Sequence, residues 1–395
     1  MERRREVVVS TDQLISVSSD ALFIAFILLL IAIVPFGFAT KSKNKRSGKI
    51  ALTLTYIAFA LQLTYFICRW IAVHHAPVSN MYEFMTFFGI MLMGAFLLIN
   101  YLYKQIAIGL FVIPISLLIS GYGSIFSNEV SPLVPSLQSN WLSIHVITVA
   151  ASSAVLSVAF VTGIMYLLRV LDTTQKNRST RSLEFVLYCL VVVIGFIMSS
   201  TFFNIFFDAQ LVEIKNREGV PEVITYTMPI IVANEEVESE RGVGVISIPS
   251  SIDAKKLNTI IWSFIIGTLL YSVIRLVTRN PIIQLLKRFT LKVNPVLLDE
   301  VSYRAVLIGF PLFSLGGLFF AMIWAQLAWG RYWGWDPKEV WALITWLFYA
   351  ALLHLRLSKG WEGERTAWLA IIGFGLIVFN QVFVNLVIAG LHSYA

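Results

Sequence analysis

The sequence predicts an all-α polytopic integral membrane protein with about ten transmembrane helices and one small loop domain outside the membrane. Of its 395 residues, 57% are apolar and only 13% are charged, whereas soluble domains have about 45–50% apolar and about 25% charged residues. A soluble protein of this composition would expose more apolar surface than water tolerates. The apolar residues also gather in ten runs, each close to the roughly 20 residues that a bilayer-spanning helix needs.

These runs divide the chain into four parts. We predict an extracytoplasmic N-terminal segment at 1–18, six spans within 19–207, a loop at 208–256 and four spans within 257–395. No A-x-A-like cleavage site follows the first span, so we interpret it as a retained anchor. Little more than Lys104 separates the third and fourth spans, which predicts a tight helical hairpin. The predicted spans are 19–39, 51–73, 85–103, 105–122, 142–168, 182–207, 257–275, 303–328, 337–357 and 366–388.

The charges between the spans predict the orientation. Alternate loops hold 19 of the 30 basic residues, and loops rich in Lys and Arg stay in the cytoplasm. Both termini and the remaining loops are therefore expected outside, in a plasma membrane or, if the chain is plastid-encoded, in a thylakoid membrane. The basic loops are 40–50, 104, 169–181, 275–304 and 356–365.

The loop at 208–256 is the only large segment between spans, and it is acidic. Its stretches Val220–Met228 and Val243–Ile248 are β-branched and alternating, which predicts a small β-ribbon. No catalytic constellation occurs there, so we interpret the loop as a solvated cap or a docking element.

Several function classes are excluded by missing motifs. The two cysteines, Cys68 and Cys189, form no C-x-x-C, so the chain has no dithiol redox pair, zinc knuckle or covalent haem site. The phosphate-binding pattern G-x-x-x-x-G-K-[ST] is absent, so no nucleotide-driven pump is expected. The basic residues are dispersed over inner loops, as membrane topology requires, so nucleic acid is not an expected partner.

Six of the eleven tryptophans lie within 324–346, around the loop W-G-R-Y-W-G-W-D-P-K-E. An aromatic belt explains one or two tryptophans at a helix end, but it does not explain this loop. The surface suits a flat, π-rich ligand with an anionic edge, and haem b (iron protoporphyrin IX) fits that description. Arg331 and Lys338 could meet the propionates. The candidate haem contacts in and beside the loop at 329–340 are Trp329, Arg331, Trp333, Trp335, Asp336, Lys338 and Trp341.

Part of this loop can also be interpreted as the start of a helix rather than as a binding site. Asp336, Pro337 and Glu339 match the N-cap, N1 and N3 positions of a helix that begins with a capping box. These three residues could simply start the ninth span.

The histidines fall at two depths. His145 begins the fifth span and His392 lies just beyond the tenth, so both are expected at the level of the tryptophan-rich loop, where they could bracket one ligand. His354 lies seventeen residues after the start of the ninth span, roughly 26 Å deeper at about 1.5 Å per residue. No other histidine of the chain reaches that depth. If His354 binds haem iron, its opposite ligand must be weak or come from another polypeptide.

Five motifs together resemble the CcsA/ResC family, the haem-handling "WWD" subunits of system II cytochrome c assembly. The resemblance covers spans two to ten. Its motifs are the tryptophan-rich loop, W-L-S-I-H-V at His145, L-H-L-R at His354, the terminal G-L-H-S-Y, and P-x-S-N-x-Y-E from Pro77 to Glu83.

The resemblance implies a function and residue roles. It implies a subunit that moves haem outward and presents it to apocytochrome c for thioether attachment at C-x-x-C-H. It implies holocytochrome c synthase activity only together with a CcsB/ResB-type partner. In this family pattern His145 and His392 are the external haem ligands, and His354 is an intramembrane ligand whose counterpart the partner supplies. Trp333, Trp335 and Asp336 match the core of the motif.

Two other function classes remain open at this point. The chain could transport another hydrophobic solute with the tryptophan-rich loop as an outer gate, or it could be a membrane scaffold without haem. Transporters built from repeats have matched broken spans in their two halves, and no such pair is evident in the sequence. The histidine pair His74 and His75 could supply ligands or serve only the structure.

Overall fold

The computed structural model describes residues 10–42, 44–130, 138–175, 177–208, 210–215, 221–234, 246–249 and 254–384. Within these residues ten helices are long and apolar enough to cross a membrane, which confirms the predicted all-α polytopic membrane protein. The first helix begins at Thr11, earlier than the predicted start at residue 19. The chain forms two compact units, Met1–Thr173 with Leu286–Ala395 and Thr174–Leu285.

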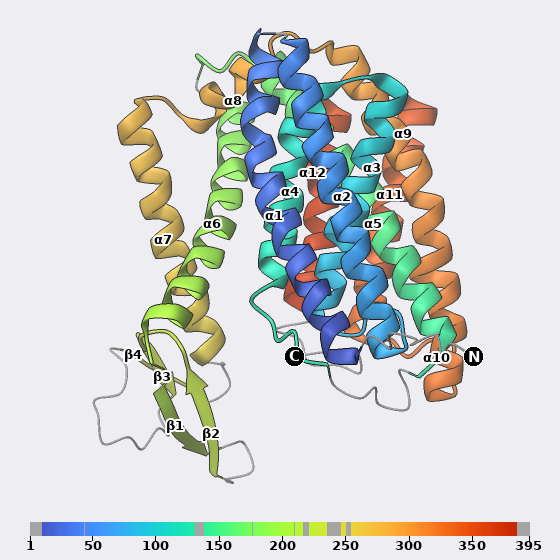
Figure 1. Ribbon diagram of the computed structural model, residues 1–395. Coiled ribbons are helices and arrows are strands. Elements are labelled where there is room, and N and C mark those ends of the chain that lie inside the picture. The colour runs from blue at the N-terminus through green and yellow to red at the C-terminus, as the bar shows by residue number, and fades with distance from the viewer. Residues whose placement is uncertain are drawn as a thin grey trace, which may run out of the picture. The chain divides into compact units, whose positions relative to one another are not determined.

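The first unit is a bundle of helices that lie side by side (Figure 1). Its central helix is α5, which contacts α3, α4, α9 and α12. The helices of this unit are α1 (Thr11–Ser42), α2 (Lys45–Val73), α3 (Met81–Tyr103), α4 (Ile106–Gly123), α5 (Asn140–Val170), α9 (Pro295–Phe313), α10 (Ala321–Trp329), α11 (Pro337–Lys359) and α12 (Glu364–Val378).

Small residues allow α5 to pack closely on its neighbours, as is usual between membrane helices. The hydroxyl of Ser152 donates a hydrogen bond of 2.9 Å to the carbonyl of Gly309 on α9. A Cβ atom at Gly163 would lie 3.0 Å from the carbonyl oxygen of Ala367 on α12. These contacts fix α5 against two other spans.

The eighth span is not a continuous α-helix. Between α9 and α10 the chain forms the π-helix η2 (Ser314–Phe320), and a second π-helix, η3 (Phe379–Val384), follows α12. Pro311, which has no backbone N–H to donate, lies just before η2. Short π-helical turns inside α-helices occur frequently at functional sites.

The predicted hairpin between the third and fourth spans is present. Lys104 ends α3 in the left-handed conformation (φ 52°), and its N–H donates to the carbonyl of Asn100. The helix α4 then starts at Ile106.

The second unit contains two long helices and the predicted β-structure. In α6 (Arg178–Phe206) and α7 (Ala254–Thr278), Gly195 and Gly267 lie so close that a Cβ atom at Gly195 would overlap the Gly267 nitrogen. The side chain of Asn258 holds the strand that contains Val232. Its Oδ1 accepts a hydrogen bond from the Val232 N–H, and its Nδ2 donates one to the Val232 carbonyl. The strand β1 (Gln210–Lys215) pairs antiparallel with β2 (Pro221–Tyr226). The strand β3 (Val232–Asn234) pairs parallel with β4 (Ile246–Ile248). The short helix α8 (Ile282–Thr290) follows α7.

Candidate functional site

A pocket opens in the first unit where four segments that are distant in sequence come together. The segments are the turn before α3 with the first residues of that helix, the start of α5, the stretch from Phe313 to Ala325, and the tryptophan-rich loop with the start of α11. Asn380 and Gln381 of η3 complete the wall. The lining is mostly apolar with a few polar side chains, a combination that is typical of small-molecule and cofactor sites.

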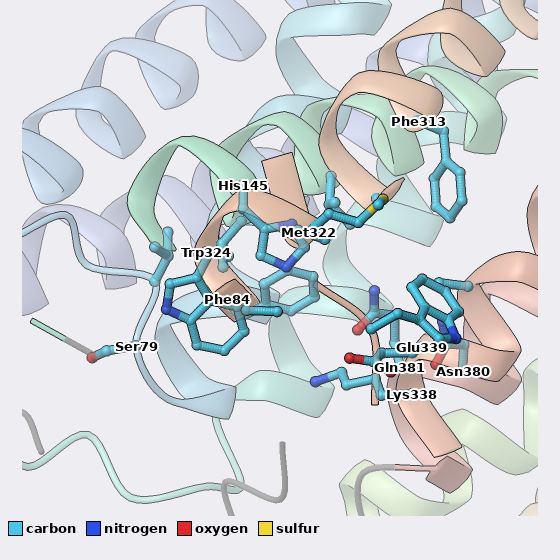
Figure 2. A pocket seen from close by; sticks show the side chains of 18 of the residues that line it. Ser79, Phe84, His145, Phe313, Met322, Trp324, Lys338, Glu339, Asn380 and Gln381 are labelled. Carbon is cyan, nitrogen blue, oxygen red and sulfur yellow. The ribbon is translucent and has the colours of Figure 1, made fainter. Parts of the chain in front are cut away.

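His145 lies in the wall of this pocket (Figure 2). Its Nδ1 is 2.8 Å from the carbonyl oxygen of Gly316 in η2. Because a carbonyl oxygen can only accept a hydrogen bond, Nδ1 carries the proton and donates it. In a neutral imidazole the lone pair is then at Nε2. The ring also stacks on Trp324, with centroids 5.8 Å apart and planes 10° apart. Trp324 is almost completely buried, so both the hydrogen bond and the stack hold the imidazole in place.

The start of α11 shapes the tryptophan-rich loop. Asp336 and Glu339 form the predicted capping box, and Pro337 is at N1. The Glu339 carboxylate accepts hydrogen bonds from the backbone N–H groups of Gly334 and Asp336. The helix-start interpretation of these residues is therefore confirmed. The same bonds hold the backbone beside Trp333, so a structural role for Asp336 and a binding role for its neighbours are compatible.

The predicted contact residues of the loop take different positions. Trp333 and Lys338 line the pocket. Trp329 packs edge-on against Trp324, with ring centroids 4.7 Å apart. Trp341 packs against Phe379, with ring centroids 4.3 Å apart. Trp335 is 70% exposed and packs edge-on against Trp333, with ring centroids 5.9 Å apart.

Arg331 is an exposed residue of the same loop. Its guanidinium covers Gly334, where a Cβ atom would lie 2.8 Å from the Arg331 side chain. Arg331 therefore packs on the loop and is not part of the pocket wall.

The pocket has two chemically different sides. Figure 2 shows His145 and Trp324 on one side, and Lys338, Glu339, Asn380 and Gln381 gathered on another. Asn380 is 6% exposed, and its Oδ1 has no hydrogen-bond partner among the residues that the structure describes. A ligand that fits this space would combine an aromatic face with a polar edge.

The P-x-S-N-x-Y-E stretch also contributes to the wall. Val78, Ser79, Asn80 and Met81 line the pocket, although none of them was a predicted contact. Their conformation is fixed from within the stretch, because Asn80 caps α3 and Glu83 accepts from both the N–H and the hydroxyl of Ser79.

The histidine pair at the end of α2 has structural contacts. His74 ends the helix in the left-handed conformation, and its N–H donates to the Trp70 carbonyl. The Nδ1 of His75 is 3.0 Å from the carbonyl of Ala76. Neither residue lines the pocket.

His354 is exposed on the surface of α11, far along the helix from the pocket. Arg356, two residues later, makes a double hydrogen bond to Asp299 at 2.7 and 2.9 Å. Asp299 also accepts from Thr366 and from the Gly363 N–H. This ion pair fixes the rotation of α11, so His354 faces away from the packed interior.

The remaining predicted ligand, His392, lies outside the described residues. Among the residues that are described, no group of three or more His, Cys, Asp or Glu side chains could hold a bare metal ion. A haem site requires fewer protein ligands than a bare metal ion, because the macrocycle supplies the equatorial ligands and a protein supplies only axial ones.

Known proteins of one kind resemble the chain over most of its length. A family model described as Cytochrome C assembly protein matches residues 259–392, which include η2, the tryptophan-rich loop and α11. A protein of Mesostigma viride named Cytochrome c biogenesis protein CcsA is 30% identical over 384 residues, 94% of each chain. Proteins of the same name from Prochlorococcus marinus and Porphyra purpurea are each 31% identical, over 94% and 89% of this chain and 91% and 87% of their own lengths.

Proposed function

Because the chain belongs to the CcsA family of cytochrome c biogenesis proteins and so serves in cytochrome c maturation, we propose that its pocket at His145 holds haem for delivery to apocytochrome c. Haem is the cargo, presented at the outer face of a plasma or thylakoid membrane. The tryptophan-rich loop lies at that face if the basic loops are cytoplasmic.

The residues of the pocket suit haem b. A metal-binding imidazole commonly donates its other ring N–H to a carbonyl or carboxylate, as His145 does to Gly316. Trp333 and Phe84 supply aromatic wall for a flat macrocycle. Lys338, on the polar side, supplies a cation for a propionate. The resemblance adds His392 as the second external ligand. The exposed side chains of Trp335 and Arg331 on the same loop would be neighbours of the haem edge.

The chain would contribute binding and orientation to the attachment reaction. In thioether formation a cysteine thiol of C-x-x-C-H adds across a vinyl double bond, so an S–C bond forms and the proton goes to the other vinyl carbon without net oxidation. Haem held by axial imidazoles and one aromatic face keeps its vinyl edge accessible, and positioning of this kind lowers the entropic part of a barrier. We propose that full synthase activity requires a CcsB/ResB-type partner.

The observation that carries this proposal is the His145 imidazole, held by Gly316 and Trp324 in the wall of a pocket that has aromatic and polar sides. The test is to co-express the chain with the candidate partner and an apocytochrome, then purify it. We expect a red complex with a Soret band, and covalent haem staining of the cytochrome. A colourless complex that still supports attachment would contradict haem binding by this chain and favour the scaffold.

The second proposed site is on the opposite half of the membrane. His354 is exposed on α11, so a ligand bound there would face a neighbouring polypeptide rather than the interior of this unit. We propose that His354 and a histidine of the partner hold haem on its way from the cytoplasmic side.

His354→Gly should therefore remove haem from the inner site. We expect the haem content of the complex to fall and to be restored by added imidazole, because imidazole can occupy the space that the side chain leaves. The neighbouring exposed residue Leu357 provides the control, since Leu357→Gly should leave haem content unchanged. Equal haem loss in both variants would indicate a helix defect and contradict ligation.

A further inference from the structure

The π-helix η2 brings an unusual backbone group to His145. The carbonyl of Gly316 accepts the N–H of Ala321, five residues later, and also the Nδ1–H of His145. A carbonyl oxygen has two lone pairs, so one oxygen can accept both bonds. In a regular α-helix the bond would come from four residues later. The π-turn thus changes where this carbonyl points along the span.

The absence of a side chain at position 316 makes this contact possible. A Cβ atom there would lie 2.8 Å from the Val149 nitrogen and 2.9 Å from the Thr148 Cβ. Atoms at this separation must move apart, and the nearest of them is backbone, which cannot rotate away. Glycine therefore allows η2 to approach α5 closely enough for the Gly316 carbonyl to reach the imidazole three residues before Thr148.

We propose that Gly316 is a positioning residue for the outer haem ligand: its carbonyl sets the Nδ1–H tautomer of His145 and so assigns Nε2 as the iron-binding nitrogen. The role in haem binding rests on the proposed function. The effect of the Gly316 carbonyl on the His145 tautomer does not, and it can be tested on protein without haem.

Two consequences follow from the hydrogen bond. It fixes the ring orientation together with the stack on Trp324, so the ligand does not have to be ordered when haem binds. It also increases the basicity of the ligating nitrogen, an effect that supporting partners of metal-bound histidines commonly have. Loss of such a partner typically weakens metal binding about 10- to 100-fold.

The first experiment measures the tautomer directly. Haem-free protein labelled with ¹⁵N-histidine is studied by nuclear magnetic resonance at about pH 9, well above the ordinary imidazole pKa of about 6.5. The His145 signals are assigned by their absence in His145→Gln. We expect the proton on Nδ1 in the wild type and a shift of population to Nε2–H in Gly316→Ala. A wild-type proton on Nε2 would overturn the proposal, even if Gly316→Ala could not be recovered folded.

A matched variant separates positioning from packing. Gly309 lies on the same span and also packs against α5, where a Cβ atom would meet Leu156 at 2.7 Å, but its carbonyl accepts from Ser152, seven residues after His145. We expect Gly309→Ala to keep the wild-type tautomer and haem affinity, whereas Gly316→Ala should bind haem about 10- to 100-fold more weakly. Equal effects of both variants on the tautomer and on affinity would overturn the proposal.

Failure of the proposed function would look different. Wild-type protein that binds no haem, yet has the Nδ1–H tautomer at His145, would contradict the haem site while leaving the hydrogen bond intact. The proposal for Gly316 as a haem-positioning residue would then be withdrawn together with that site.

Discussion

Replacing His145 by glycine is expected to abolish haem retention in the outer pocket and covalent attachment to the cytochrome. Among the residues that the structure describes, His145 is the only histidine in the pocket wall. Because loss of a supporting partner of a ligand already costs about 10- to 100-fold in affinity, loss of the ligand itself should exceed about 100-fold. The readouts are the Soret absorbance of the purified complex and haem staining of the cytochrome on a denaturing gel.

The control is another histidine that is held by a backbone carbonyl. His75 contacts the Ala76 carbonyl but does not line the pocket, so His75→Ala should retain haem and attachment. Added imidazole should partly restore the Soret band of His145→Gly, because the cavity left in the wall can hold it. Normal haem content in His145→Gly would contradict ligation, and equal loss in both variants would point to a general defect.

The membrane architecture could be predicted because hydrophobic length is a local property. Each span needs about 20 apolar residues, and that requirement is visible without knowledge of its neighbours. The hairpin at Lys104 and the capping box at Asp336 are equally local, since a few adjacent residues determine them. The start of α1 at Thr11 was missed because its first turns are polar and extend beyond the apolar run.

The interior of the site could be predicted only in part, because its contacts are not local. His145 and Gly316 are 171 residues apart in the chain, and no periodicity in the sequence indicates that they meet. The sequence also could not tell which tryptophans face inward. Trp335 is exposed in a left-handed conformation, whereas Trp324, outside the quoted motif, stacks on His145. The doublet Gly316–Gly317 was the available signal, since paired glycines in a span suggest close helix approach.

A second large effect is expected at the buried ion pair between α2 and α3. The Nε of Arg69 donates to Glu83 Oε1 at 2.7 Å, with both side chains at most 2% exposed. Arg69 also donates to the Asn128 carbonyl and lies over the Tyr82 ring. Removal of one partner leaves an uncompensated buried charge, which typically destabilises a protein by about 3–5 kcal/mol.

Glu83→Gln should therefore lower the free energy of unfolding in detergent by about 3–5 kcal/mol, although glutamine has nearly the same shape. The measurement is equilibrium unfolding followed by tryptophan fluorescence. The exposed pair Arg304–Glu300, with side chains 56% and 39% exposed, provides the control, and Glu300→Gln should change stability little. Unchanged stability in Glu83→Gln would contradict the buried-charge argument.

The double variant Arg69→Met/Glu83→Gln decides whether charge or shape is the cause. With both charges removed, no buried charge remains unpaired, so the double variant should be more stable than either single variant. Haem content should follow the same order, because Glu83 holds Ser79 through two hydrogen bonds and the residues from 78 to 81 form one wall of the pocket. A double variant whose destabilisation equals the sum of the two single losses would show that the residues act through packing, and the pocket wall would then depend on shape alone.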